Sequence, residues 1–80
     1  MFLEIITPSK KIYSGEVTLV KFPGNDGSFE ILENHAPIIS TLEEGQIKVI
    51  DHHKEVSFFD INGGVVEAKS NKIVVLVESA

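Results

Sequence analysis

The segment EVSFFDINGGVVEAKSNKIVVLV, residues 55–77, decides the fold class, because short apolar runs alternate in it with residue pairs that favour turns. Asn62-Gly63 and Ser70-Asn71 separate the runs, and Asn, Ser and Gly are common turn residues. The apolar residues recur with a period of two or stand in short continuous runs, and neither pattern is helical. The segment therefore predicts three consecutive β-strands, with a type I′ hairpin turn at Asn62-Gly63 in which both residues have positive φ.

The same pattern covers the rest of the chain, where further turn formers are found at Pro8-Ser9, Ser14-Gly15, Pro23–Gly27 and Glu44-Gly45. We expect an all-β fold, a two-sheet antiparallel β-sandwich of about nine or ten short strands, as one domain over residues 1–80. The expected strands are Phe2–Thr7, Lys11–Ser14, Val17–Phe22, Ser28–Leu32, Ile38–Leu42, Gln46–Ile50, Glu55–Ile61, Gly64–Lys69 and Lys72–Val77. The expected core residues are Ile5, Val17, Leu19, Ile31, Ile47, Val49, Phe58, Val65, Ile73 and Val75.

Composition limits the classes of partner. The net charge is −5, and the seven basic residues are scattered lysines without any arginine, which disfavours nucleic-acid binding. The longest apolar run, Ile73–Val77, is far too short for a membrane span. The N-terminus lacks the basic region of a signal peptide, and the absence of cysteine fits a reducing compartment. We expect no direct membrane insertion.

Several of the expected strands carry apolar residues on both faces, which a single-layer sheet would leave exposed on one side. Phe58-Phe59 and Val65-Val66 are adjacent pairs, and residues 73–77 are continuously apolar. Two explanations remain open. Either the twisted ends of a sandwich bury parts of both faces, or another protein covers an outer face.

The residue types that catalyse reactions or bind metal ions show no pattern typical of an active site. His52 and His53 stand at a polar hairpin tip, where we expect adjacent side chains to point to opposite faces and not to share a metal ion. Asn25 and Asp26 provide too few oxygen donors for a calcium loop. We therefore expect no catalytic residue, no metal site and no cofactor.

Lys54, at the same hairpin tip, raises an alternative function. Lipoyl and biotinyl carrier domains are also small, acidic and all-β, and they present a modified lysine at such a tip. Those families flank the lysine with Asp and Ala or with Met on both sides, whereas Lys54 stands between His53 and Glu55. A free-standing small β-sandwich with a ligand-binding or carrier role is therefore kept as the alternative.

The order of the motifs resembles a known family. FPGNDGSFEILENHAPIISTLEEGQIKV (residues 22–49) and FFDINGGVVEAKSNKIVVLVESA (residues 58–80) are similar to the N-terminal β-sandwich domain of the ATP synthase epsilon subunit, called delta in mitochondria. The most specific motifs are His35-Ala36-Pro37 and residues 63–67, GGVVE, and residues 3–17 resemble the opening strand and turn of the family. Glu30 and Glu33-Asn34 depart from the pattern, which has Gly and Pro-Gly at those places. Asn tolerates the left-handed conformation that the Gly is expected to serve.

The resemblance implies a non-catalytic central-stalk, or rotor, subunit of a proton-translocating F-type ATP synthase, peripheral to the cytoplasmic face of the bacterial inner membrane. It implies docking on the gamma subunit and on the c-ring, so that proton flow is coupled to rotation and to ATP synthesis. Relatives continue into a C-terminal helical hairpin, and the sequence stops at Ala80 before it. We therefore expect no hairpin-type inhibition and no intrinsic nucleotide binding.

The bend around Pro37 is the expected interaction site. Because Pro37 has no amide hydrogen and restricts Ala36, the chain must leave its sheet there, and we expect Ile38 and Ile39 to anchor the bend. The turn at residues 24–28 is expected to emerge at the same end of the sandwich, opposite His53.

The resemblance implies which residues of this bend meet a partner. The c-ring polar loops would face Ser28, Glu33, Asn34, His35, Ala36 and Pro37. Ile39, Ser40 and Thr41 are implied to lie near gamma. His35 has a second interpretation, in which it hydrogen-bonds a nearby backbone carbonyl and pins the bend.

Overall fold

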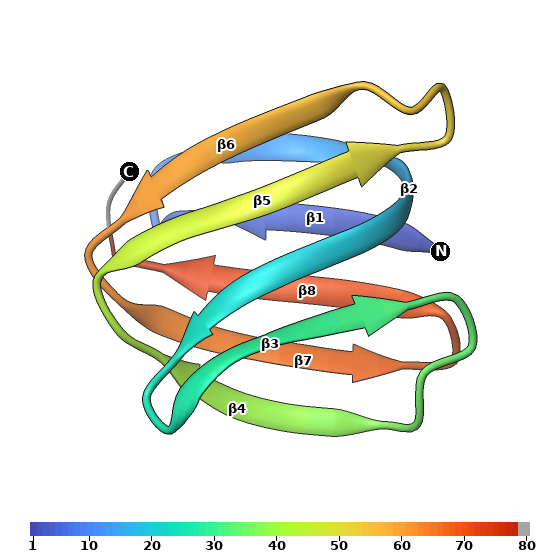
Figure 1. The fold of residues 1–80 in the computed structure, drawn as a ribbon. Helices are drawn as coiled ribbons and strands as arrows, with labels where there is room; N and C mark the ends of the chain where they lie inside the picture. The colour runs from blue at the N-terminus through green and yellow to red at the C-terminus, as the bar shows by residue number, and fades with distance from the viewer. Residues whose placement is uncertain (79–80) are drawn as a thin grey trace.

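The structure is a computed structural model that describes residues 1–78, and in these residues it contains eight β-strands and no helix (Figure 1). Accordingly, no described segment is a helix that could cross a membrane. The strands are β1 (Phe2–Ile6), β2 (Lys11–Gly24), β3 (Gly27–Leu32), β4 (Ile38–Leu42), β5 (Gly45–Asp51), β6 (Val56–Ile61), β7 (Gly64–Lys69) and β8 (Lys72–Val77). The all-β prediction is confirmed, and only Ser79 and Ala80, the end of the second motif, lie outside the described residues.

The strands form two packed layers within one hydrogen-bonded network. The strand order is β1-β8-β7-β4-β2-β5-β6, with β3 also paired to β2 and β1 also paired to β2. In Figure 1, β6, β5, the second half of β2 and β3 form a front layer, and β1, β8, β7 and β4 lie behind it. We call these the front layer and the back layer.

β2 connects the two layers. Its residues up to Glu16 pair with β1. From Val17 on it pairs with β5, with a register shift between Val17 and Leu19, and from Leu19 on it also pairs with β3. Such an irregularity bends a strand and lets it pass from one sheet to another. The prediction of a turn at Ser14-Gly15 is therefore wrong, because Gly15 lies inside this 14-residue strand opposite Leu3. This continuity is why the sandwich has eight strands instead of nine or ten.

One strand pair departs from the antiparallel prediction. β1 and β8 run parallel, with Leu3 opposite Ile73 and Ile5 opposite Val75. The two strands come from opposite ends of the chain and are not joined by a hairpin, so no turn imposes an antiparallel direction on them.

The type I′ turn lies elsewhere than expected. Ser70 and Asn71 both have positive φ, 53° and 64°, and they join the paired strands β7 and β8. At Asn62-Gly63 only Gly63 has positive φ, at 137°, because this connection leads from β6 in the front layer to β7 in the back layer and is not a hairpin. Gly64 follows at a close approach of two strands, where an added Cβ would lie 2.2 Å from the Leu76 carbonyl oxygen.

The core between the layers confirms most of the predicted residues. Ile5, Val17, Ile31, Ile47, Val49, Ile73 and Val75 are all buried in it. Leu19 is only half-buried. The prediction that Phe58 and Val65 belong to the core is wrong, because 57% and 39% of their surface is exposed. In each adjacent apolar pair the other residue faces inward: Val66 is fully buried, and Phe59 packs against the core.

The pair Val65-Val66 gives a direct test of this assignment. Val66→Ala should lower the free energy of unfolding by about 2 kcal/mol, because it removes buried methyl groups and leaves a cavity. Val65→Ala should cost less than about 1 kcal/mol, because its side chain faces outward. Urea unfolding of both variants measures the difference, and equal losses would show that the inward face has been assigned incorrectly.

Candidate protein-interaction surfaces

The loops gather at two ends of the sandwich. β3 and β5 both pair antiparallel with β2, so they run in the same direction and finish at the same end. The loops that follow them, residues 33–37 and 52–55, share this end with the turn at Ser70-Asn71 (Figure 1, right). We call it the His35 end. The opposite end, with the turn at residues 25–26, is the Ser28 end.

The expectation that Ser28 and His35 emerge together, opposite His53, is wrong. Ser28 stands at the beginning of β3, opposite Pro23, and His35 follows the end of the same strand. At about 3.3 Å per residue the two are roughly 15 Å or more apart along the strand direction. His53, in contrast, lies at the same end as His35 (Figure 1). No flat surface at one end can contact both Ser28 and the bend at Pro37.

At the His35 end, Glu33 joins the N-terminus to the β7–β8 turn. One of its carboxylate oxygens accepts a hydrogen bond from the Met1 α-ammonium group, and the other accepts one from Asn71 Nδ2 at 3.2 Å. The ammonium group also donates to the Val17 carbonyl oxygen at 3.2 Å and lies 3.4 Å from a Glu16 carboxylate oxygen. The charge that replaces the usual Pro of the motif is therefore neutralised within the chain.

These contacts shift the pKa values of both groups. The hydrogen bond from the Met1 ammonium group, followed by that from Asn71, lowers the pKa of the Glu33 carboxyl. The hydrogen bond to Glu33 raises the pKa of the Met1 amine, although desolvation opposes the shift. The pair is therefore most stable as an ion pair between the two ordinary pKa values.

The bend itself is held by local hydrogen bonds. Asn34 has a φ of 61°, the left-handed conformation expected for it, and its amide donates to Asn71 Oδ1 at 3.0 Å. His35 donates its amide to the Leu32 carbonyl, and its Nδ1 lies 2.6 Å from the Ala36 carbonyl oxygen. This carbonyl contact supports the interpretation in which His35 pins the bend. Ala36 and Pro37 complete the loop and are exposed.

The Ser28 end is acidic and its side chains are less engaged. Asn25 donates from Nδ2 to Thr41 Oγ1 at 2.9 Å and thereby holds the tight turn that was expected in place of a calcium loop. Among the described interactions, none involves the side chain of Asp26 or Ser28. Glu43 and three further charged residues are exposed at the same end. They are Lys10, Glu44 and Glu78.

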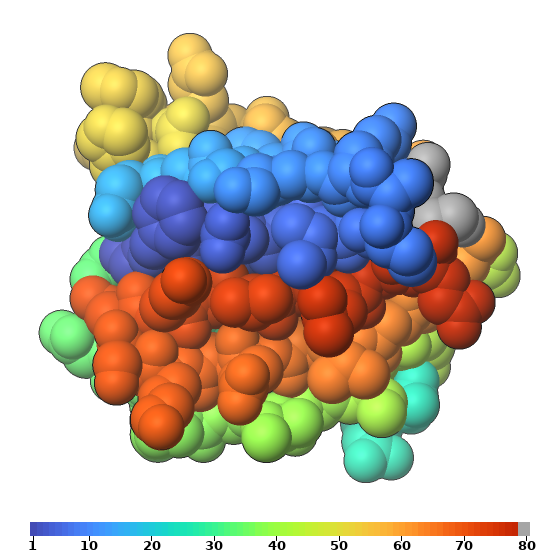
Figure 2. Space-filling view, turned by 180° about the vertical axis from the view of Figure 1, so that it is seen from behind, coloured from blue at the N-terminus to red at the C-terminus, as the bar shows by residue number. Residues whose placement is uncertain are grey.

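The outer face of the back layer carries a row of apolar side chains. Cross-strand pairing places Thr41 opposite Val65, Val65 opposite Leu76, and Leu76 opposite Ile6. Leu76 is 54% exposed, and together with Val65 and Ile6 it lines an open hollow at the Ser28 end, with Pro8 and Gly64. Figure 2 shows this face from behind, with β1, β8, β7 and β4 in order and no other described segment across it.

Three residues of β4 were predicted to lie near gamma, and two of them are on this outer face. Ile39, which is 72% exposed, and Thr41 point outward, so the expectation that Ile39 anchors the bend is wrong. Ile38, its neighbour, packs against the core instead. Ser40 lies on the inward side of the strand, opposite the buried Val66, and it cannot reach a partner on the outer face.

The two histidines of the hairpin tip lie side by side. Contrary to the expectation of opposite faces, the His52 and His53 rings lie together, with centroids 4.0 Å apart, because both residues belong to a turn. The described part of the chain contains no group of three or more His, Asp or Glu residues that could hold a metal ion. Asp51 organises the tip by accepting hydrogen bonds from the amides of His53 and Glu55.

Sequence reasoning did not locate this apolar row. Adjacent apolar residues signalled that an outer face is apolar, but two neighbouring residues do not reveal which one faces out. Only the register shows that Ile6, Val65 and Leu76 come together from three strands.

The Glu33 contacts predict a pH-dependent contribution to stability. Glu33→Gln should lower the melting temperature most near pH 6, where both charges are present. A lowered carboxyl pKa stabilises the fold above the unfolded pKa, so the difference should shrink below about pH 4. A raised amine pKa stabilises it below the unfolded pKa, so the difference should also shrink above about pH 9.

Thermal unfolding from pH 3 to pH 10 measures this difference. Glu30→Gln, at an exposed position without an ion pair among the described residues, is the control. A Glu33→Gln effect that stays constant with pH would contradict the ion pair.

Comparison with known proteins identifies the family. The model of the family described as ATP synthase, Delta/Epsilon chain, beta-sandwich domain matches residues 1–80. An ATP synthase epsilon chain from Chlorobium limicola is 42% identical over 76 residues, covering 95% of this chain and 86% of the relative. One from Sulfurimonas denitrificans is 45% identical over 78 residues, which cover 98% of this chain but only 60% of the relative.

Solved structures share the fold. A chain of the Euglena gracilis mitochondrial ATP synthase superposes with a TM-score of 0.88 at 16% identity, covering 96% of this chain and 49% of the other. A chain from the central stalk and c-ring of the Tetrahymena thermophila enzyme gives 0.78 at 22% identity, covering 96% and 62%. The chain therefore belongs to the family of ATP synthase delta/epsilon chains, and it matches the β-sandwich domain of that family over residues 1–80.

Proposed function

We propose that the chain docks on the gamma subunit through the outer face of the back layer and turns with gamma and the c-ring. The observation that carries this proposal is the apolar row on this face, in which Val65 and Leu76 are exposed and Ile6 is half-buried, with the exposed Ile39 nearby. An exposed apolar patch on a small domain marks an interaction site. Family membership supplies the partner, because this domain works in the central stalk.

The fold suits a part that transmits torque. Every described strand is hydrogen-bonded to at least one other, and β2 ties the front layer to the back layer. A close-packed core between two cross-linked layers resists deformation. A force applied at the docking face is thus carried through the whole domain, so proton-driven rotation is coupled to ATP synthesis without a catalytic residue in this chain.

The Ser28 end is the better candidate for contact with the c-ring polar loops. The apolar row lies at this end of the docking face, so a gamma segment bound there brings the Ser28 end next to the shaft. The polar groups of Glu33, Asn34 and His35 are occupied within the chain, whereas those of Asp26 and Ser28 are available. In this arrangement the chain sits peripherally at the cytoplasmic face of the bacterial inner membrane.

The docking face is tested by charge insertion at matched positions. Leu76→Asp should weaken binding to the cognate gamma subunit about 30-fold or more, as expected for a residue central to an interface. Phe58→Asp, at a similarly exposed apolar residue on the outer face of the front layer, should leave the affinity within about threefold. Isothermal titration calorimetry measures both, and the reverse ranking would move the gamma site to the front layer.

The orientation is tested by single cysteines, since the chain has none of its own. Ser28→Cys should form a disulfide with a cysteine in the c-subunit polar loop of the assembled enzyme. His35→Cys and His53→Cys, both at the opposite end, should not. Cross-linking at His35 and His53 but not at Ser28 would show that the domain sits the other way up.

A further inference from the structure

The outer face of the back layer changes in polarity from one end to the other. Cross-strand pairing divides it into three rows. The row nearest the Ser28 end contains Thr41, Val65, Leu76 and Ile6. The middle row contains Ile39, Glu67, Val74 and Glu4, and the row nearest the His35 end contains Lys69, Lys72 and Phe2.

The two carboxylates of the middle row differ in their pairing. Glu4 lies 2.9 Å from Lys11 Nζ and 3.8 Å from Lys72 Nζ. Glu67, in contrast, takes part in no ion pair or side-chain hydrogen bond among residues 1–78. Glu67 is thus the uncompensated charge of this row.

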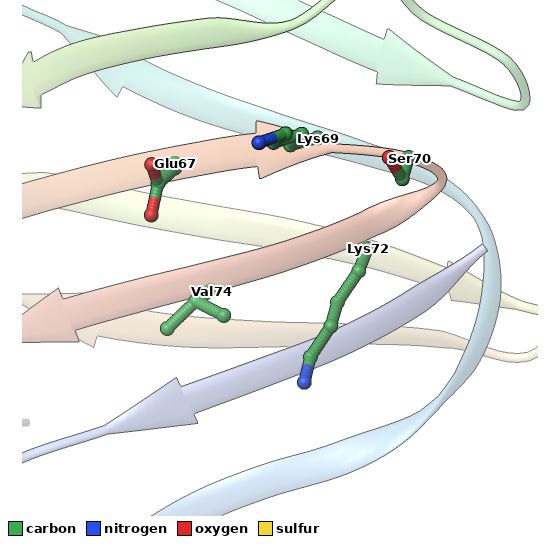
Figure 3. A pocket seen from close by; sticks show the side chains of 5 residues that line it. All are labelled: Glu67, Lys69, Ser70, Lys72 and Val74. Carbon is green, nitrogen blue, oxygen red and sulfur yellow. The ribbon is translucent and has the colours of Figure 1, made fainter.

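Both cross-strand neighbours of Glu67 are apolar, although two lysines line the same hollow. Its cross-strand neighbours are Ile39, which is 72% exposed, and the half-buried Val74. Figure 3 shows the Glu67 carboxylate at the edge of an open hollow that Lys69, Ser70, Lys72 and Val74 also line. Lys72 extends toward β1, the strand that carries Glu4, so it does not neutralise Glu67 (Figure 3).

A partner that covers the apolar row and Ile39 would also cover Glu67. Removing a carboxylate from water without a counter-charge is unfavourable and offsets much of the gain from apolar burial. A complementary cation restores the balance and also fixes the register of the two surfaces. Glu67 therefore sets a chemical requirement on whatever segment docks here.

We propose that Glu67 is the specificity-determining residue of this docking face and accepts a Lys or Arg side chain from the docked gamma segment. The proposal rests on the proposed docking function. Lys69 sets the direction in which the segment docks. It has no ion pair among the described residues and lies toward the His35 end, where it can accept an acidic partner. The segment that fits the face carries apolar, then basic, then acidic residues from the Ser28 end to the His35 end.

The test measures the affinity of the cognate gamma subunit for variants of the full chain. Glu67→Lys should weaken binding by about 30-fold or more, and Glu67→Gln by about tenfold, because each leaves a cation on gamma unpaired. Asp60→Asn, at an exposed acidic residue on β6 in the front layer, is the matched control and should change the affinity less than twofold. Reversing single Lys and Arg residues of gamma to Glu should identify one variant that restores binding to Glu67→Lys.

Each outcome separates this inference from the docking proposal. All variants should keep the wild-type melting temperature within a few degrees, since Glu67 is exposed. If Leu76→Asp abolishes binding while Glu67→Lys does not weaken it, the face docks gamma but Glu67 stays in solvent, and the inference is overturned. If Glu67→Gln tightens binding, the carboxylate is covered without a counter-charge, which also overturns it. If neither Leu76→Asp nor Glu67→Lys changes the affinity, the docking proposal itself fails.

Discussion

The structure depends on one strand that belongs to both layers. β2 pairs with β1 in the back layer, and with β5 and β3 in the front layer, and its last residue, Gly24, reaches Leu42 of β4. In a chain of 80 residues, where little apolar surface is available, this sharing lets a single core serve both layers. The bend near Val17 allows β2 to belong to both layers. It also determines which side chains of β2 point into the core before and after Val17.

Sequence patterns were sufficient for the fold class but not for the spatial arrangement. Alternating apolar residues and turn formers identify strands wherever burial is one-sided, as in β5, where Ile47 and Val49 are buried. Phe58-Phe59 and Val65-Val66 defeat this rule, because an adjacent pair fits either face and only cross-strand partners decide between them. Ser14-Gly15 favours a turn by local propensity, but Gly15 pairs with Leu3 of a different strand, and this tertiary contact keeps it within β2.

The candidate site was partly predictable for the same reason. The bend at Ala36-Pro37 follows from backbone chemistry, and the left-handed conformation of Asn34 follows from the steric tolerance of that residue. Placing Ser28 beside His35 failed because a turn and a loop at the two ends of one strand lie apart, however close they are in sequence. Predicting the apolar row would require the registers of three strand pairs, β4 with β7, β7 with β8, and β8 with β1. No local sequence pattern contains this information.

The parallel pairing of β1 with β8 affects how the domain is made. Residues 2–6 are synthesised first, but β8, residues 72–77, must leave the ribosome before β1 gains its second neighbour. Such a contact between distant segments slows folding. The front layer can form early from the hairpins of β2 with β3 and of β5 with β6, which are close in sequence. The surface formed by β1, β8 and β7 is complete only once β8 has paired with both β1 and β7, so a chain that ends before β8 does not present it.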